Sequence, residues 1–212
     1  DKLDPISISK AYYDKEEMME LEKKDETYQW LRKKNRLYED QLNHLRKYKV
    51  TFQNQLSICF PGYLDLFKDG YSDIPMTILK KYPHPDLLKN KKAETVARYL
   101  EKNTCHTHKV SLEYALKIIE FAKKTYPGCE KDDVEVEIFK ILLDKVIETQ
   151  RECEKTLNEM ITVASTLEEY RYISSIDGIG PNLAARIIAE IGDIEEFKSR
   201  EKYSRAKKKY KL

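Results

Sequence analysis

Apolar residues recur at intervals of three and four along two long segments of the chain. In the first, residues 16–59, no proline or glycine interrupts the pattern, which stops before Pro61 and Gly62. In the second, residues 131–170, the same spacing is kept throughout. Such spacing fills heptad a and d positions, so it predicts two long helices. The first row is Leu21, Tyr28, Leu31, Tyr38, Leu42, Leu45, Phe52, Leu56 and Cys59; the second is Phe139, Leu142, Val146, Thr149, Cys153, Thr156, Met160, Val163 and Leu167.

Neither helix can bury such a row by itself. The two helices must pair with each other as an antiparallel hairpin, or with copies of themselves in a dimer, and the pattern allows both. Asn35 and Lys49 fall within the first seam. Polar seam residues cost stability but fix the register and the orientation of the partner.

The segments between and after these helices predict an all-α protein. "SDIPMTILKKYPHPDLL", "AETVARYLEKN" and "SLEYALKIIEFAKKTYPG" have helical apolar spacing, with prolines at positions 75, 83 and 85 as boundaries. No segment shows the alternation of a strand. We therefore expect a long-helix region over residues 16–170 with short inserted helices, a helix–hairpin–helix module over 171–198 and a basic tail over 199–212.

Positive charge is concentrated at the end of the sequence. The 39 basic and 37 acidic residues nearly cancel, but the last eight residues, "RAKKKYKL", contain no acid. That tail, with Lys207, Lys208 and Lys209, suits a phosphate contact or a solvated end.

The cysteines form no C-x-x-C pair, which favours a reduced, cytoplasmic setting. No apolar run has the ~20 residues that span a bilayer. The "CHTH" stretch at residues 105–108 has no standard zinc spacing.

The stretch "SIDGIGPNLAARIIAEIGD", residues 175–193, places two glycines directly before an apolar run. Apolar positions before and after these glycines resemble the helix–hairpin–helix motif of DNA-binding proteins. Gly178 and Gly180 permit backbone angles that a Cβ resists, and Ile179 is expected to fill the core between the two helices. Pro181 suits the first position of the second helix.

A turn of this kind predicts an anion site. The N–H groups of Gly178, Gly180 and Asn182 would lie at a helix N-terminus, where they can hold a phosphate without reading base sequence. Asp177 places a carboxylate beside that site. The alternative is that the turn only packs two helices together and binds nothing.

The resemblance extends along the chain. "ISSIDGIGPNLAARIIAEIGDIEEFKS" is similar to the signature of the insertion-sequence one-ten transposases (the Piv and MooV invertase relatives). "KKNRLYEDQL", "CFPGYLDLF" and "ILKKYPHPDLL" are similar to the middle region of that family, and "DKLDPISIS" to a stretch that carries acidic residues. The resemblance implies DNA recombination by an RNase-H-like domain with four acidic Mg²⁺ ligands and by a nucleophilic serine, in many members with a guide RNA.

By position, Asp1 and Asp4 match the last two of those acids, so the resemblance makes them catalytic and metal-binding candidates, and residues 1–15 the end of the RNase-H-like domain. The first two acids have no counterpart, and neither Ser199 nor Ser204 lies in the family's serine context. We therefore expect a part of a DNA transposase that binds nucleic-acid backbone, forms a homodimer, and has no activity and no bound cofactor by itself. The alternative is a non-catalytic coiled-coil scaffold.

Overall fold

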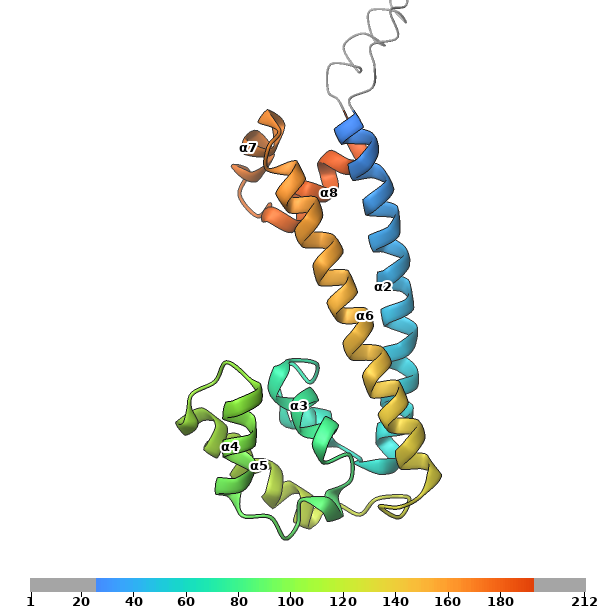
Figure 1. Cartoon of the computed structure of the whole chain (residues 1–212), viewed down its shortest axis with the longest axis vertical. Coiled ribbons are helices and arrows are strands. Elements are labelled where there is room, and N and C mark those ends of the chain that lie inside the picture. The colour runs from blue at the N-terminus through green and yellow to red at the C-terminus, as the bar shows by residue number, and fades with distance from the viewer. Residues whose placement is uncertain (1–25, 193–212) are drawn as a thin grey trace, which may run out of the picture. The chain divides into compact units, whose positions relative to one another are not determined.

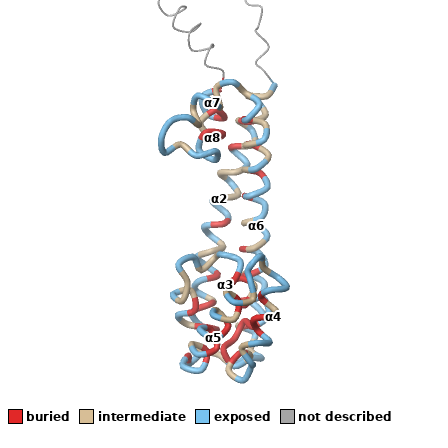
Figure 2. Tube along the Cα trace, turned by 90° about the vertical axis from the view of Figure 1, so that its left-hand side faces the viewer, coloured by how far each residue is buried: buried red, intermediate tan, exposed pale blue. Residues whose placement is uncertain are grey.

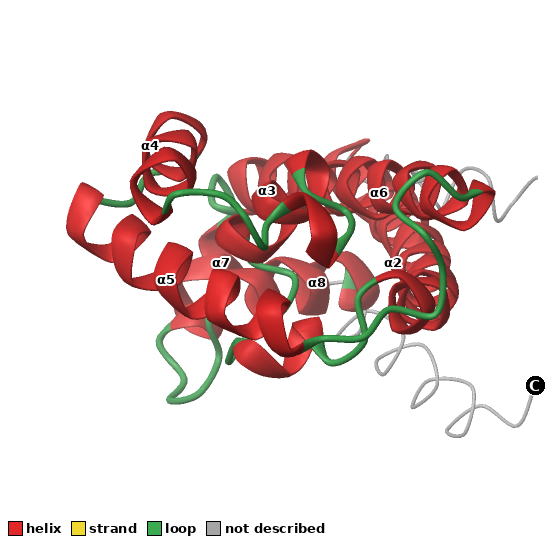
Figure 3. Ribbon diagram, turned by 90° about the horizontal axis from the view of Figure 1, so that it is seen from below, coloured by secondary structure: helices red, strands yellow, loops and turns green. Residues whose placement is uncertain are grey.

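The computed structural model describes residues 26–192, and every regular element in that range is a helix. Figure 3 shows only helices and connecting loops in this range. The expected all-α fold with long helices is confirmed. The beginning of the first predicted helix, residues 16–25, lies outside the described residues.

Two compact units make up the described chain. The hairpin unit combines residues 26–40 with residues 153–192, and the inserted unit consists of residues 41–152. Helix α2, Glu26–Cys59, and helix α6, Val134–Ala164, each contribute residues to both units. Figure 1 colours α2 blue to cyan and α6 yellow to orange.

The two long helices pair with each other inside each unit. In the hairpin unit, Lys34 Nζ on α2 lies 2.6 Å from Glu159 Oε2 on α6. In the inserted unit, the rings of Phe52 and Phe139 stack with 5.3 Å between centroids, and Gln55 Nε2 donates to the Glu135 carbonyl at 3.0 Å. Partner numbers on α6 fall as those on α2 rise, so the helices are antiparallel. The seam is therefore buried within one chain.

Most predicted seam residues are buried. On α2, Leu31, Phe52 and Cys59 are fully buried, and the polar Asn35 is 2 % exposed. On α6 the row departs from the prediction at two places, because Leu143 and Ala164 are buried where Leu142 and Val163 were expected, and the latter two are only partly buried. A nearly straight helix has 3.6 residues per turn rather than 3.5, so its buried row drifts away from a strict heptad.

The second long helix ends earlier than predicted. It stops at Ala164, and a separate short helix, α7, Glu168–Ser174, follows. The hydroxyls of Ser165 and Thr166 donate to the carbonyls of Thr162 and Val163, three residues earlier. These bonds compete with the backbone ladder and favour a turn over a continued helix.

The inserted unit carries the three short α-helices that the sequence predicted, together with two 3₁₀ turns. They are the 3₁₀ turn η1, Tyr63–Leu66, helix α3, Asp73–Lys81, the 3₁₀ turn η2, Pro85–Leu87, helix α4, Ala93–Asn103, and helix α5, His108–Lys124. One boundary was wrong, because Pro75 lies inside the first turn of α3 rather than at its edge. The missing N–H of proline costs nothing in a first turn, where that group has no helical partner.

Aromatic side chains fill the core of the inserted unit. The Phe52 ring contacts the rings of Phe139 and Tyr71, and the Phe60 and Tyr63 ring centroids are 4.9 Å apart. The buried Tyr63 hydroxyl donates to the Pro75 carbonyl at 3.0 Å, so its polar atom is satisfied. Figure 2 shows the buried positions in red along α3, α4 and α5. Fully buried members of this core include Phe52, Phe60, Tyr63, Ile78, Leu79, Leu88, Leu100, Ile118 and Phe139.

Candidate nucleic-acid interface

Helices α7 and α8 flank the turn that contains the two glycines, and residues 168–192 are called the hairpin below. Side-chain hydroxyls of Ser174 and Ser175 donate to the carbonyls of Arg171 and Tyr172, which helps to end α7. The chain then turns and enters α8, Pro181–Ile191, with Pro181 in its first turn as predicted. Helix α8 ends at Gly192, whose φ of 73° lies in the left-handed region.

The turn depends on one glycine rather than two. Gly178 has a φ of 87°, a conformation that residues with a Cβ rarely adopt. Gly180 has a φ of −78° and a ψ of 171°, which is ordinary extended backbone, so the expectation that it needs special angles was wrong. A Cβ at either position would have no heavy atom within 4 Å. The turn is therefore open to approach by a ligand.

Three backbone N–H groups of the turn are available to an anion. Within residues 26–192, no hydrogen-bond acceptor is assigned to the backbone N–H of Gly178, Gly180 or Asn182. Gly178 and Asn182 are exposed, and Gly180 is the N-cap of α8 without a side-chain cap. Free N–H groups at the start of a helix carry partial positive charge and suit a phosphate oxygen.

The interior of the hairpin differs from the expected one. Ile179 is only partly buried and is not a member of the hydrophobic cluster that holds the hairpin. Ile176, before the turn, is 55 % exposed. The cluster is instead built by small residues of α8 against the two long helices. Its buried members are Leu31, Met160, Ala164, Ala185, Ile188 and Ala189, with Trp30 and Ile173 among the partly buried residues around them.

Polar contacts also dock α8 onto α2. Asn35 Nδ2 donates to Glu190 Oε1 at 2.6 Å, so the polar seam residue does contact a partner helix. Arg186 forms an ion pair with Glu39, and its guanidinium carbon lies 5.5 Å from the centroid of the Tyr38 ring. Because Arg186 is engaged with α2, it does not offer a free cation to a phosphate. Sequence reasoning missed Glu39 and Glu190, whose partners are about 150 positions away.

The charge around the turn does not favour an anion by itself. Residues 168–192 contain two arginines and four acids. Asp177 is exposed directly beside Gly178, as the sequence suggested. A phosphate at the turn would therefore depend on the backbone N–H groups and on cations from elsewhere, because the local side chains are net negative.

The remaining candidates are not brought into this site. Asp1, Asp4, Lys207, Lys208 and Lys209 lie outside the described residues. Inside residues 26–192 no group of three or more metal-ligating side chains is close enough to hold an ion. His108, in the "CHTH" stretch, contacts Glu101 and Glu94 instead. Among the described helices, none has the length and apolar character needed to cross a membrane.

A comparison with protein families bears on this segment. Residues 170–205 match the model of the Transposase IS116/IS110/IS902 family. The resemblance to this transposase family is confirmed. The match includes most of α7, the turn with Gly178, and the whole of α8. It supports a transposase or recombinase as the class of protein, and that class implies an interaction with DNA. No curated protein and no solved structure matches the chain.

Proposed function

We propose that this chain is part of a transposase or recombinase and that its hairpin holds the backbone of DNA. The observation that carries the proposal is the open turn at Gly178, with unbonded N–H groups at the start of α8, inside the segment that matches the transposase family. Phosphate contacts of this type position a protein on DNA without reading its sequence. Lys207, Lys208 and Lys209 follow α8 in sequence and are proposed to supply the missing positive charge.

Gly178→Val is expected to weaken binding to a short labelled duplex by about tenfold, because the strained backbone costs ~1–2 kcal/mol and disturbs the N–H groups. Fluorescence anisotropy at low and moderate salt measures this. Gly180→Ala is the matched control and should bind like the wild type, since Gly180 has an extended backbone with free space around it.

Asp177→Asn removes a negative charge beside the turn and should tighten binding to the same duplex several-fold, by roughly 1 kcal/mol.

The scaffold alternative has its own support, because the buried alanines of α8 and the contacts of Asn35 and Arg186 show that the hairpin packs on α2. The salt dependence of binding distinguishes DNA binding from the scaffold function, because phosphate contacts weaken steeply as the salt concentration rises. Binding that is unchanged in Gly178→Val, with circular dichroism showing a folded chain, would favour the scaffold.

An unlabelled RNA competitor in the same DNA titration tests the proposed guide RNA.

We also expect that the chain alone does not cleave DNA. Asp1 and Asp4 are proposed Mg²⁺ ligands by resemblance, and two carboxylates are too few to fix the two-metal geometry of an in-line displacement. Incubation of supercoiled plasmid with the purified chain and Mg²⁺ should leave the plasmid intact. Nicking that disappears in Asp4→Ala would contradict this expectation.

The homodimer stays a prediction. It was inferred from a seam that must be buried, and the pairing of α2 with α6 buries that seam within one chain. Self-association would therefore use a surface outside the seam. Sedimentation at tens of micromolar protein decides the matter, because a compact monomer there would contradict the homodimer.

A further inference from the structure

Two thiols lie close together at one end of the inserted unit. Cys59 is the last residue of α2, and Cys129 lies in the loop between α5 and α6. Their Sγ atoms are 3.9 Å apart, and both cysteines are free thiols. A disulfide needs a separation of about 2.05 Å, so the two sulfur atoms are near contact but not bonded.

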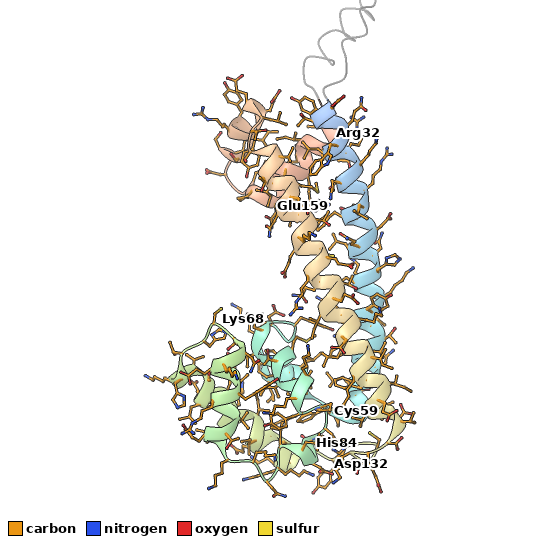
Figure 4. All side chains as sticks on the ribbon, in the orientation of Figure 1. Arg32, Cys59, Lys68, His84, Asp132 and Glu159 are labelled. Atoms are coloured by element: carbon orange, nitrogen blue, oxygen red, sulfur yellow. The ribbon has the colours of Figure 1, made fainter. Side chains whose placement is uncertain are left out.

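Hydrogen bonds hold the backbones of both cysteines in place. The Gly128 N–H donates to the Ile58 carbonyl at 2.8 Å, which ties the loop to the end of α2. His84, which is fully buried, lies with Nε2 3.1 Å from the Cys129 carbonyl. Its Nδ1 accepts a hydrogen bond from the Asp86 N–H, so Nε2 carries the proton and donates it to the Cys129 carbonyl oxygen. Figure 4 labels Cys59 and His84 in this part of the unit.

The two thiols differ in access. Cys59 is fully buried, whereas Cys129 is partly exposed. Burial raises the pKa of the Cys59 thiol to about 12, and it also raises the pKa of Cys129. A small oxidant therefore reaches Cys129 first, and its reaction at neutral pH is slow because little thiolate is present.

We propose that Cys59 and Cys129 form an intramolecular disulfide on exposure to hydrogen peroxide. The Cys129 sulfur attacks one peroxide oxygen, the O–O bond breaks, and the released hydroxide takes the thiol proton to form water. The Cys59 sulfur then attacks the sulfenic sulfur. The S–S bond forms, the S–O bond breaks, and the leaving hydroxide takes the Cys59 proton as a second water. Two thiols lose two electrons and the peroxide is reduced to two waters.

This bond would close a covalent loop across the inserted unit. The cysteines are 70 positions apart, and the segment between them contains α3, α4 and α5. To form the bond, the Sγ atoms must approach from 3.9 Å to about 2.05 Å, while the contacts at Gly128 and His84 hold the two segments together. A cross-link of this length restricts the unfolded chain and so stabilises the unit.

The test uses the full chain with Cys105→Ser and Cys153→Ser, which leaves Cys59 and Cys129. After treatment with hydrogen peroxide and alkylation in denaturant, the protein should take up no label and should yield a cross-linked peptide that joins both cysteines. The thermal midpoint should rise by about 5–10 °C and return after dithiothreitol.

The control is the same chain with Cys129→Ser, which should take up one label and show no shift of the thermal midpoint. Two labels after prolonged peroxide, over-oxidation of Cys129 without a cross-link, or a cross-link only between molecules would each overturn the proposal. A raised thermal midpoint that persists in the Cys129→Ser control would overturn it as well.

Discussion

Replacing Phe52 with alanine is expected to lower the free energy of unfolding by about 3–5 kcal/mol. Phe52 is fully buried, and its ring contacts those of Phe139 and Tyr71, with centroid distances of 5.3 and 6.0 Å. The truncation leaves a cavity beside the fully buried Phe139, and a close-packed core closes such a cavity only in part. Urea denaturation followed by circular dichroism measures the loss.

Val50→Ala is the matched control for Phe52. Val50 lies two residues from Phe52 on the same helix and is 58 % exposed, so its truncation should change the free energy of unfolding by less than about 0.5 kcal/mol. Similar losses in both variants would show that helix propensity, rather than the aromatic core, determines the stability of this region.

Leu31→Ala is expected to cost about 2–5 kcal/mol in the hairpin unit. Leu31 is fully buried in the cluster that joins α2 to Met160 on α6 and Ala185 on α8. Trp30, the chain's one tryptophan, packs against the same cluster. Its fluorescence during urea denaturation therefore reports on this unit, and the variant should unfold at a lower urea concentration.

Leu37→Ala serves as the control for Leu31, since Leu37 is on the same helix and 45 % exposed. We expect its fluorescence transition to stay close to that of the wild type. An unchanged transition in Leu31→Ala would mean that the hairpin does not depend on this cluster for its place on α2.

Periodicity was sufficient to predict the helices because burial of a helix face leaves a local trace in the sequence. The uninterrupted row up to Cys59 and the stop at Pro61 and Gly62 agree with the end of α2. The early end of α6 was missed because apolar spacing continues through Val163 and Leu167. The turn there depends on hydroxyl bonds to the backbone, which periodicity does not detect.

The candidate site was predictable only in part. Glycine spacing located the turn, but it could not show that Gly178 alone has a positive φ and that Gly180 is extended. The pairs Asn35–Glu190 and Glu39–Arg186 join segments that are distant in sequence. A single sequence carries no signal for such pairs, although the position of Asn35 in the seam suggested that it orients a partner.

The order of the two units along the chain has a consequence for synthesis on the ribosome. The inserted unit is one continuous stretch, residues 41–152, whereas the hairpin unit needs residues 26–40 together with residues 153–192. Domains fold as units as the chain emerges, so the inserted unit can fold while the start of α2 still lacks its partners. Leu31 can pack against Met160 and Ala164 of α6 first, but its cluster is complete only after α8 has left the exit tunnel. A pause in translation before residue 181 would prolong the interval in which this apolar face is partly open to chaperones or to aggregation.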